Sequence, residues 1–552
     1  MKYKIAQIGT FDLENYGDLL FPIVFEKKIK QYLNVEEILL FSPEGGKMPF
    51  YPDKKVYSLN ELEEKIKTDN INAIVIGGGD LIRYDKNVAP NYGNDYYTTY
   101  CLWQLPIILA KKYDIPVIFN NPGVPFNITQ TYKEMSELLL NSCDYLSVRD
   151  VTSKQRLKLL DLNQKINVIP DTILSISDVY NHKFLTEYWK KLKKELGIDY
   201  NYIIFQHNSA NITNNSYIKK LQSELKKIIE HSDIHIIFMP IGYVHNDKEK
   251  MEKIYDKDNN RMHFINRKLS PIEMLSLISN SNFFIGTSLH GIITSNSYNI
   301  PAIAINPRHL TKIDGYFSQI KCKGNDIDDI TLISKKYLSV VNKKMKFNIN
   351  ESKTKINHHF ENMAYNISNY KSNRKVKYYE DFINLIYDKF NNSETNMINV
   401  INIYKDTGNG YNQYEKTEII EKAPLSIEIK INKGDKNIRI DPIELRYIVI
   451  NKIDVFDSNN NKISFDLSEH IFYDGKFYMI TTDPQILIKN NNYTKIKLIL
   501  DYEIIKNLEI LKNIKDKNDK LKERIEKIEN KTVYKIYAKL KKISNYIVKR
   551  KD

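Results

Sequence analysis

The chain has 552 residues, 42% of them apolar and 27% charged, which excludes collagen-like and wholly disordered proteins and requires two to four domains. Three scattered cysteines are too few for a disulfide framework or a zinc cluster, and no run of about eighteen apolar residues is present to span a membrane. The net charge is +14, and residues 531–552 supply half of it, because they hold eight Lys or Arg against one acid.

The N-terminus begins directly with the strand-like segment KYKIAQIG and has no long apolar leader. Together with the few cysteines, this predicts a cytoplasmic protein. The charge alone is no argument for nucleic-acid binding, because the basic tail carries no recognised reading motif. We therefore expect no nucleic-acid partner.

Residues 1–180 alternate short apolar runs with helical patterns. Strands are expected at 2–9, 37–42, 72–79, 116–123, 145–150 and 166–171. Helix-like spacing fills segments between them, such as 98–113 and 130–143. This alternation predicts a parallel sheet covered on both faces, so we assign 1–180 to an α/β Rossmann-like domain.

The first strand is followed by a turn that contains Asn15, Gly17 and Asp18. Glycine allows the backbone to approach a ligand closely, and the free N–H groups of the helix that follows favour an anion or a polar group. Alternatively, Asp18 only caps the helix.

Three consecutive glycines, Gly77, Gly78 and Gly79, directly follow another strand, and Asp80 comes after them. Such a run costs backbone entropy unless the backbone must approach something closely. It lacks the GxGxxG spacing and no Walker-type lysine follows, so a nicotinamide or P-loop site is disfavoured. A tight strand-to-helix turn is the alternative interpretation.

Two further strands end in charged residues, Arg149 with Asp150 and then Asp171. An arginine in this place is able to grip a carboxylate or phosphate with two parallel hydrogen bonds. The alternative is an Arg149–Asp150 ion pair that only orders the turn.

The α/β pattern restarts after a connecting helix over 182–197, which Gly197 ends. Strands are expected at 200–208, 235–242, 263–267, 282–288 and 301–307. Residues 181–340 thus form a second Rossmann-like domain. The simplest architecture is two such domains facing a cleft, with ligands beyond the carboxyl ends of the strands.

The second domain carries the motif Ser288-Leu289-His290 after an apolar strand. A lone histidine is more often structural than functional, but small polar neighbours at a strand end favour a functional role. Arg308 and Lys312, after the next strand, add positive charge to the same edge. No spacing typical of a metal site is present.

The rest of the chain changes character. Residues 341–395 are predicted to be a closing helical segment plus linker, and the β-branched runs of 396–503 predict an antiparallel β-sandwich. Residues 504–552 combine a short coiled-coil seam, whose polar position is Asn518, with a basic amphipathic helix. The seam favours a homo-oligomer. The helix over 531–552 suits an anionic membrane surface, or else it is solvated and packs on protein.

The order of these motifs resembles polysaccharide pyruvyl transferases. The resemblance covers about 1–330 and rests on the series N-x-G-D, GGGD, S-x-R-D, P-D and S-L-H-G. It implies two Rossmann-like domains like those of glycosyltransferases of the B type. It also implies transfer of a pyruvyl group from phosphoenolpyruvate, as co-substrate without a separate cofactor, to hydroxyls of a glycan or lipid-linked saccharide of the cell surface.

The resemblance places His290 and Arg149 near the donor, with Asn15, Gly17 and Asp18 lining the facing domain. Lys312 is similar to a lysine that follows the last strand in many members. In the expected chemistry His290 is the general acid.

A carboxyl, Asp18 or Asp171, takes the proton of the sugar hydroxyl. The residues that bind substrate are predicted to be Asn15, Gly17, Gly78, Gly79, Asp80, Arg149, Ser288, Arg308 and Lys312.

One departure concerns the donor. Several members of the family carry Arg-Leu-His where this chain has Ser288-Leu289-His290. A nucleotide-sugar-dependent glycosyltransferase of the same fold is therefore the first alternative. The second is a non-catalytic assembly factor that holds a polysaccharide-synthesis complex at the inner face of the membrane through residues 504–552.

Overall fold

The structure is a computed structural model, and its contacts divide the chain into two units, 1–392 and 393–552. It describes residues 2–84, 101–128, 130–208, 212, 214–307, 309–322, 324–342, 349–371, 382, 384–385, 400–406, 411, 416–420, 423–432, 434–443, 447–481, 484–505, 510, 514, 516 and 517.

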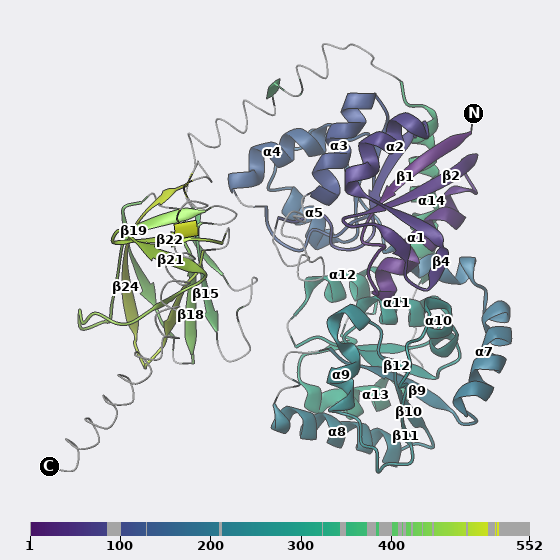
Figure 1. The fold of residues 1–552 in the computed structure, drawn as a ribbon. Helices are drawn as coiled ribbons and strands as arrows, with labels where there is room; N and C mark the ends of the chain where they lie inside the picture. Colours follow the sequence, from purple (N-terminus) through teal and green to yellow (C-terminus); the bar gives the residue numbers. More distant parts are fainter. Residues whose placement is uncertain are drawn as a thin grey trace, which may run out of the picture. The chain divides into compact units, whose positions relative to one another are not determined.

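The first sheet of unit 1 has the order β3-β4-β2-β1-β5-β6 and is parallel except for the β3–β4 pair (Figure 1). Its strands are β1 (Tyr3–Ile8), β2 (Val35–Ser42), β3 (Gly46–Met48), β4 (Tyr51–Ser58), β5 (Ala73–Gly77) and β6 (Val117–Asn120). A parallel pair, β7 (Leu146–Val148) and β8 (Ile166–Val168), continues this edge through a bridge between Ile118 and Tyr145. The helical elements are α1 (Tyr16–Ile29), η1 (Leu59–Glu61), α2 (Leu62–Thr68), α3 (Cys101–Tyr113), α4 (Gln130–Asn141), α5 (Val151–Leu157), η3 (Thr172–Ser175) and α6 (Ile176–Val179). We call this part the first domain.

The second sheet has the order β11-β10-β9-β12-β13-β14 and is parallel throughout. Its strands are β9 (Tyr202–Gln206), β10 (His235–Phe238), β11 (Met262–Phe264), β12 (Phe283–Gly286), β13 (Ala302–Ile305) and β14 (Asp326–Ile327). Its helical elements are α7 (His182–Leu196), α8 (Asn215–Glu230), η5 (Tyr243–His245), α9 (Asp247–Glu252), α10 (Pro271–Ser279), α11 (Leu289–Ser297), α12 (Thr311–Gln319), η6 (Ile330–Leu332) and α13 (Ile333–Asn342). We call this part the second domain.

Both sheets are doubly wound, as predicted. Every strand expected in the two α/β domains overlaps an observed strand, and Gly197 ends α7 with a left-handed φ of 65°. In each sheet the order of the strands switches sides at one place, between the parallel neighbours β1 and β5 and between β9 and β12. Ligands bind at such switch points. The fold therefore predicts a binding site among the loops that follow β1, β5, β9 and β12.

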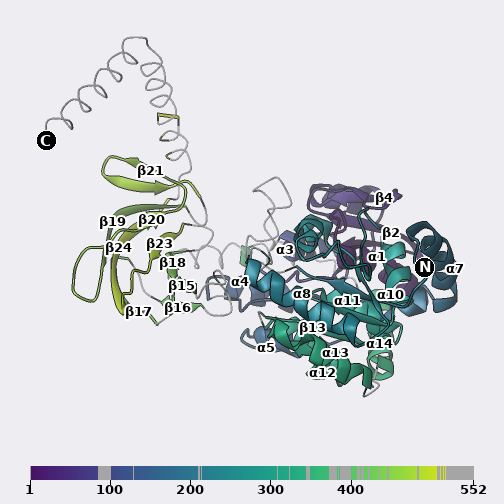
Figure 2. The same cartoon turned by 90° about the horizontal axis from the view of Figure 1, so that it is seen from below.

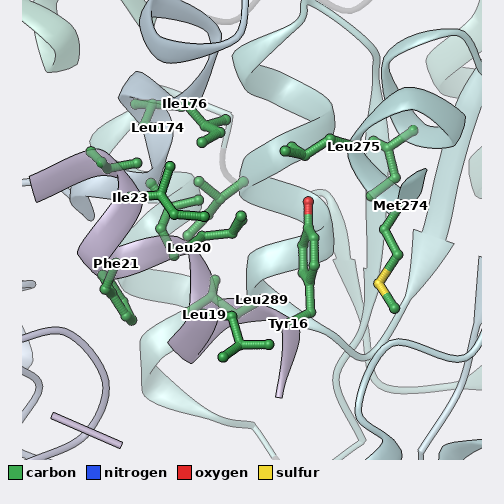
Figure 3. Packing of buried hydrophobic residues seen from close by; sticks show 14 of the residues in the cluster. Tyr16, Leu19, Leu20, Phe21, Ile23, Leu174, Ile176, Met274, Leu275 and Leu289 are labelled. Atoms are coloured by element: carbon green, nitrogen blue, oxygen red, sulfur yellow. The ribbon is translucent and has the colours of Figure 1, made fainter. Parts of the chain in front are cut away.

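Helix α1 joins the two domains. It is buried nearly all round, which is typical of a helix enclosed on every side. Leu19 and Leu20 lie near Met274, Leu275 and Leu289 of the second domain (Figure 3). One apolar cluster therefore runs through both domains.

Helix α14 (Ile349–Ser368) returns the chain to the first domain. Its Phe360 ring lies 6.2 Å from that of Phe25, and Nε2 of His359 lies 2.9 Å from Oδ1 of Asn120. The Tyr145 hydroxyl bonds the other His359 nitrogen at 3.0 Å. Burial lowers the pKa of His359 to about 3, so this link is neutral.

Unit 2 contains two antiparallel five-stranded sheets, β16-β15-β18-β23-β20 and β17-β24-β19-β22-β21 (Figure 2). Their strands are β15 (Val400–Asp406), β16 (Thr417–Ile420), β17 (Leu425–Lys430), β18 (Asn437–Asp441), β19 (Ile448–Phe456), β20 (Asp466–Leu467), β21 (His470–Tyr473), β22 (Lys476–Met479), β23 (Ile486–Lys489) and β24 (Lys495–Ile504). One apolar core, which includes Ile438 and Leu498, holds both sheets together. The predicted β-sandwich is confirmed. The predicted coiled coil and basic tail lie almost wholly outside the described residues.

Candidate functional site

The loops after the switch-point strands of both sheets line one cavity of about 470 Å³. Several residues singled out in the sequence line it, namely Asn15, Asp18, Gly79, Asp80, Arg149, Ser288, His290 and Lys312. Gly17, Gly78 and Asp171 do not line the cavity but lie next to residues around it. Arg308 lies outside the described residues.

The two glycines behind the cavity are required by close packing. A Cβ atom on Gly17 would lie 1.8 Å from Nδ1 of His290, and one on Gly78 would lie 2.3 Å from the ring of Phe21. Gly78 also has a left-handed φ of 87°, which few other residues adopt at low cost. Both glycines therefore allow α1 to approach the functional loops.

Asp80 bridges two cations of the cavity. Its Oδ1 accepts a hydrogen bond of 2.5 Å from Nη2 of Arg149, and its Oδ2 accepts one of 3.2 Å from Nζ of Lys312. Burial opposes ionisation of Asp80, but Arg149 and Lys312 outweigh it and hold the pKa of this carboxyl well below its usual range. Asp80 thus occupies the place of an anion between an arginine of the first domain and a lysine of the second.

Three acids surround Arg149. Besides Asp80, the guanidinium lies 3.7 Å from Asp150 and 4.0 Å from Asp171. Only 5% of Arg149 is exposed, and burial disfavours its charge, yet the three carboxylates keep its pKa above the usual value. The alternative noted from the sequence, an Arg149–Asp150 pair, is thus one contact of a larger charged cluster.

His290 projects from the first turn of α11, which Ser288 caps by accepting a hydrogen bond from the N–H of Gly291. Its Nε2 is buried without a hydrogen bond and lies 3.6 Å from Oδ2 of Asp171, which also has no hydrogen bond. At this distance the two groups form an ion pair if the imidazole is protonated. Phe21 packs its ring edge against the imidazole at 5.3 Å and so restricts the other side.

Asp18 has the chemistry of a group that exchanges protons near neutral pH. Burial raises its pKa from 3.8 to about 6, although His290 and a hydrogen bond with Thr10 act in the opposite direction. The cavity therefore combines a carboxyl that titrates near pH 6 with an imidazole on the facing domain.

A pH-dependent gain in stability is expected for Asp18→Asn. Because the folded-state pKa of Asp18 is raised, its contribution to stability is complete below about pH 4 and is lost as the pH rises through about 6. The variant should unfold in urea like wild type at pH 4 but gain about 2–3 kcal/mol at pH 7.5. Asp53→Asn, at an exposed position of β4, is the control and should change little. Equal stability of wild type and Asp18→Asn at pH 7.5 would contradict the assignment.

The second-domain wall of the cavity includes residues that sequence reasoning missed. Gln206, Asn208 and Asp247 line it together with Thr287. Gln206 is the last residue of β9, a strand that was correctly predicted. Its position at the carboxyl end of that strand could have indicated that it lies at the site. Asp247 belongs to a run of charged residues that is typical of a solvent-exposed helix, so the burial of its side chain could not be predicted from the sequence.

No cluster of His, Cys, Asp or Glu suited to a metal ion occurs among the described residues. No helix in this same part of the chain is long and apolar enough to cross a membrane.

Comparison with known families gives one match that covers more than half of the chain. A family model described as polysaccharide pyruvyl transferase matches residues 15–309 of the 552. The match includes the loop of Asn15 at its beginning and the motif of His290 near its end.

Solved structures with a similar fold include a UDP-GlcNAc 2-epimerase from Methanocaldococcus jannaschii, which is 17% identical with a TM-score of 0.46 over 67% of this chain and 99% of that one. A glycosyltransferase from Rickettsia africae is 14% identical with a TM-score of 0.39 over 72% and 99%. Likeness at this level says nothing about what this chain binds. Among curated proteins, Troponin C-akin-1 of Drosophila melanogaster is 31% identical over 64 residues, which are 11% of this chain and only 38% of that protein.

Proposed function

Because this chain belongs to the polysaccharide pyruvyl transferase family, we propose that it transfers a pyruvyl group from phosphoenolpyruvate to hydroxyls of a cell-surface glycan precursor. One observation carries the proposal. A single cavity holds the cations Arg149 and Lys312, the imidazole of His290 and the carboxyl of Asp18, whose pKa is about 6.

The donor would be held by its two acidic groups. Phosphoenolpyruvate carries a carboxylate and a phosphate, and both suit the fork of Arg149 and the ammonium of Lys312. Asp80 bridges these two cations, as an anionic ligand would. We propose that donor binding displaces Asp80 from at least one of them.

Helix N-termini compensate for the serine at position 288. Helices α1, α11 and α12 all begin at the cavity, with Asn15, Ser288 and Leu310 as their cap residues. Free N–H groups at a helix start favour negative charge. Three such starts supply positive potential without the arginine that several family members have in place of Ser288.

The proposed reaction needs one proton donor and one acceptor. Protonated His290 gives a proton to the methylene carbon of the donor, which becomes a methyl group, and ionised Asp18 takes the proton of the sugar hydroxyl that attacks the neighbouring carbon. A second hydroxyl then gives its proton to the neutral His290 and attacks the same carbon. The bond from that carbon to the phosphate oxygen breaks, phosphate leaves as inorganic phosphate with the proton that Asp18 held, and a cyclic ketal remains. Asp171 is buried behind His290, a position that suits orienting the imidazole rather than meeting the acceptor.

The proposal also includes contact with a membrane surface and formation of a homo-oligomer. Both would depend on residues outside the described part of the chain. The basic tail over 531–552 is our candidate for contact with the inner face of an anionic membrane, where a lipid-linked acceptor would be presented. The seam around Asn518 is our candidate for a homo-oligomer.

Thermal unfolding with candidate donors tests the proposed function. Phosphoenolpyruvate at about a hundred times its dissociation constant should add roughly 2.7 kcal/mol to the stability of the protein. Pyruvate and inorganic phosphate, which each carry half of its acidic groups, should stabilise the protein less. Released inorganic phosphate, measured with a saccharide acceptor, then reports transfer.

Nucleotide sugars form the other arm of this experiment. Stabilisation by a UDP-sugar without any effect of phosphoenolpyruvate would overturn the proposed donor. Ser288 would then mark a change of donor, and the glycosyltransferase would replace the pyruvyl transferase as the function of this cavity.

A further inference from the structure

A buried carboxylate of the second domain, Asp247, holds the loops around the cavity in place. It begins α9 and is only 1% exposed. It accepts hydrogen bonds from Nε2 of Gln206 at 2.9 Å, Nδ2 of Asn208 at 2.5 Å, and the N–H groups of Gly242 and Ile241 at 2.9 and 3.4 Å. One side chain thus fixes the ends of two adjacent strands, β9 and β10.

Gln206 carries this link to the loop before His290. Its Oε1 accepts hydrogen bonds from the N–H groups of Thr287 at 3.1 Å and Ser288 at 2.9 Å. The amide has only one possible orientation, because a carboxylate only accepts and a backbone N–H only donates. Gly286 leaves room for it, since a Cβ there would lie 3.0 Å from Oε1.

Asp247 also acts on the facing domain. Gly242, which it holds, forms a β-bridge with Asn15, and the N–H of Val244 donates to the carbonyl of Glu14 at 3.4 Å. Asn15 is the cap residue of α1, and Asp18 lies in the first turn of that helix. Hydrogen bonds from a single carboxylate therefore lead to the starts of both helices that bear the proposed acid and base.

We propose that Asp247 is a positioning residue that sets His290 and Asp18 relative to each other, and that it governs turnover rather than donor affinity. This inference rests on the proposed function. The donor cations Arg149 and Lys312 belong to other hydrogen bonds, with Asp80, so their grip does not depend on Asp247. Misplacement of reacting groups by about 1 Å costs about 10²-fold in rate.

The first test is Asp247→Asn. An amide has one accepting atom instead of two, so at least one of the four donors faces an N–H group and its loop shifts. We expect kcat to fall about 100-fold, with the KM for phosphoenolpyruvate and the donor-induced rise in melting temperature close to wild type. A kcat within threefold of wild type, or a raised KM with normal kcat, would overturn the proposal.

Gln206→Glu gives a readout that a merely structural role would not produce. The new carboxylate at position 206 faces Asp247, and the two cannot both ionise at hydrogen-bond distance. Lys250 donates a hydrogen bond to Oδ1 of Asn208, which in turn donates one to Asp247. Turnover of the variant should be poor at pH 8 and recover relative to wild type as the pH falls, because one shared proton restores the link. If the ratio of the variant's kcat to that of wild type stays constant between pH 5.5 and 8, the proposal is contradicted. This test does not depend on whether Asp247→Asn folds.

The matched control is Glu224→Gln in the same domain. Glu224 is a carboxylate of α8, 3% exposed, and it accepts from the N–H and hydroxyl of Ser334 at 3.0 and 2.6 Å, away from the cavity. This variant should lose stability but keep kcat. If Glu224→Gln loses turnover as much as Asp247→Asn, general destabilisation explains both. If wild type itself shows no response to phosphoenolpyruvate, the proposed function fails instead.

Discussion

His290→Ala is expected to transfer pyruvyl groups roughly 10²–10⁴ times more slowly than the wild-type protein while it still binds phosphoenolpyruvate. The imidazole projects from the first turn of α11 into the cavity, and Asp171 lies 3.6 Å from its buried Nε2. Removing it takes away the proposed proton donor but leaves Arg149 and Lys312 to hold the donor. Initial rates of phosphate release give the loss in kcat, and the donor-induced rise in melting temperature gives the binding.

His309→Ala is the matched control, because this histidine is exposed and pairs only loosely with Asp328, at 3.8 Å. It should keep wild-type turnover. If His290→Ala retains more than about a third of the wild-type rate, His290 is not the general acid. Loss of donor binding together with turnover would assign the imidazole to binding instead.

Arg149→Ala is expected to lose both donor binding and stability. Arg149 is 5% exposed and its guanidinium faces Asp80, Asp150 and Asp171, so its removal takes away the cation that these buried carboxylates share. Breaking a buried ion pair in this way costs about 3–5 kcal/mol. Urea unfolding measures this loss, and phosphoenolpyruvate should no longer raise the melting temperature.

The double variant Asp80→Asn with Arg149→Ala separates the two effects. Removing the closest carboxylate relieves part of the uncompensated charge, so the double variant should be more stable than Arg149→Ala alone. Donor binding should stay lost, because the fork that holds the donor is missing. An Arg149→Ala protein with wild-type stability, or one that phosphoenolpyruvate still stabilises, would show that the charged cluster does not have the assigned role.

The sequence predicted the two parallel sheets because buried parallel strands are short runs of apolar residues that polar turns interrupt. It missed the β3–β4 hairpin, since the strand Tyr51–Ser58 carries a proline and three charged side chains and has little of the expected pattern. It also predicted a closing helical segment plus linker over residues 341–395. Helix α14 lies there, and its apolar residues Ile356, Phe360 and Met363 follow helical spacing within a polar composition.

The cavity could be predicted on the sides where functional residues directly follow a strand, as Asp80 and Arg149 do. The part of its second-domain wall around Asp247 could not be predicted, although Ser288, His290 and Lys312 on the same side were. Asp247 becomes buried only because the ends of β9 and β10 enclose it, and Gln206 has an ordinary place in its strand until Asp247 and Thr287 fix its amide. These relations arise from tertiary contacts, which a local pattern does not contain.

The return of α14 to the first domain has a consequence for the order in which the protein is made. Asn120 and Tyr145 of the first domain both form hydrogen bonds with His359, which follows the entire second domain in the chain. Residues 181–342 are synthesised before this helix, and at roughly 5–20 residues per second His359 follows residue 342 by only about 1–3 s. The first domain therefore cannot complete its core until the whole second domain has been made, unlike the usual N-terminal-first order. Nascent chains that stop before residue 349 would leave exposed the apolar surface that Phe360 and Met363 cover, which is the kind of surface that chaperones recognise.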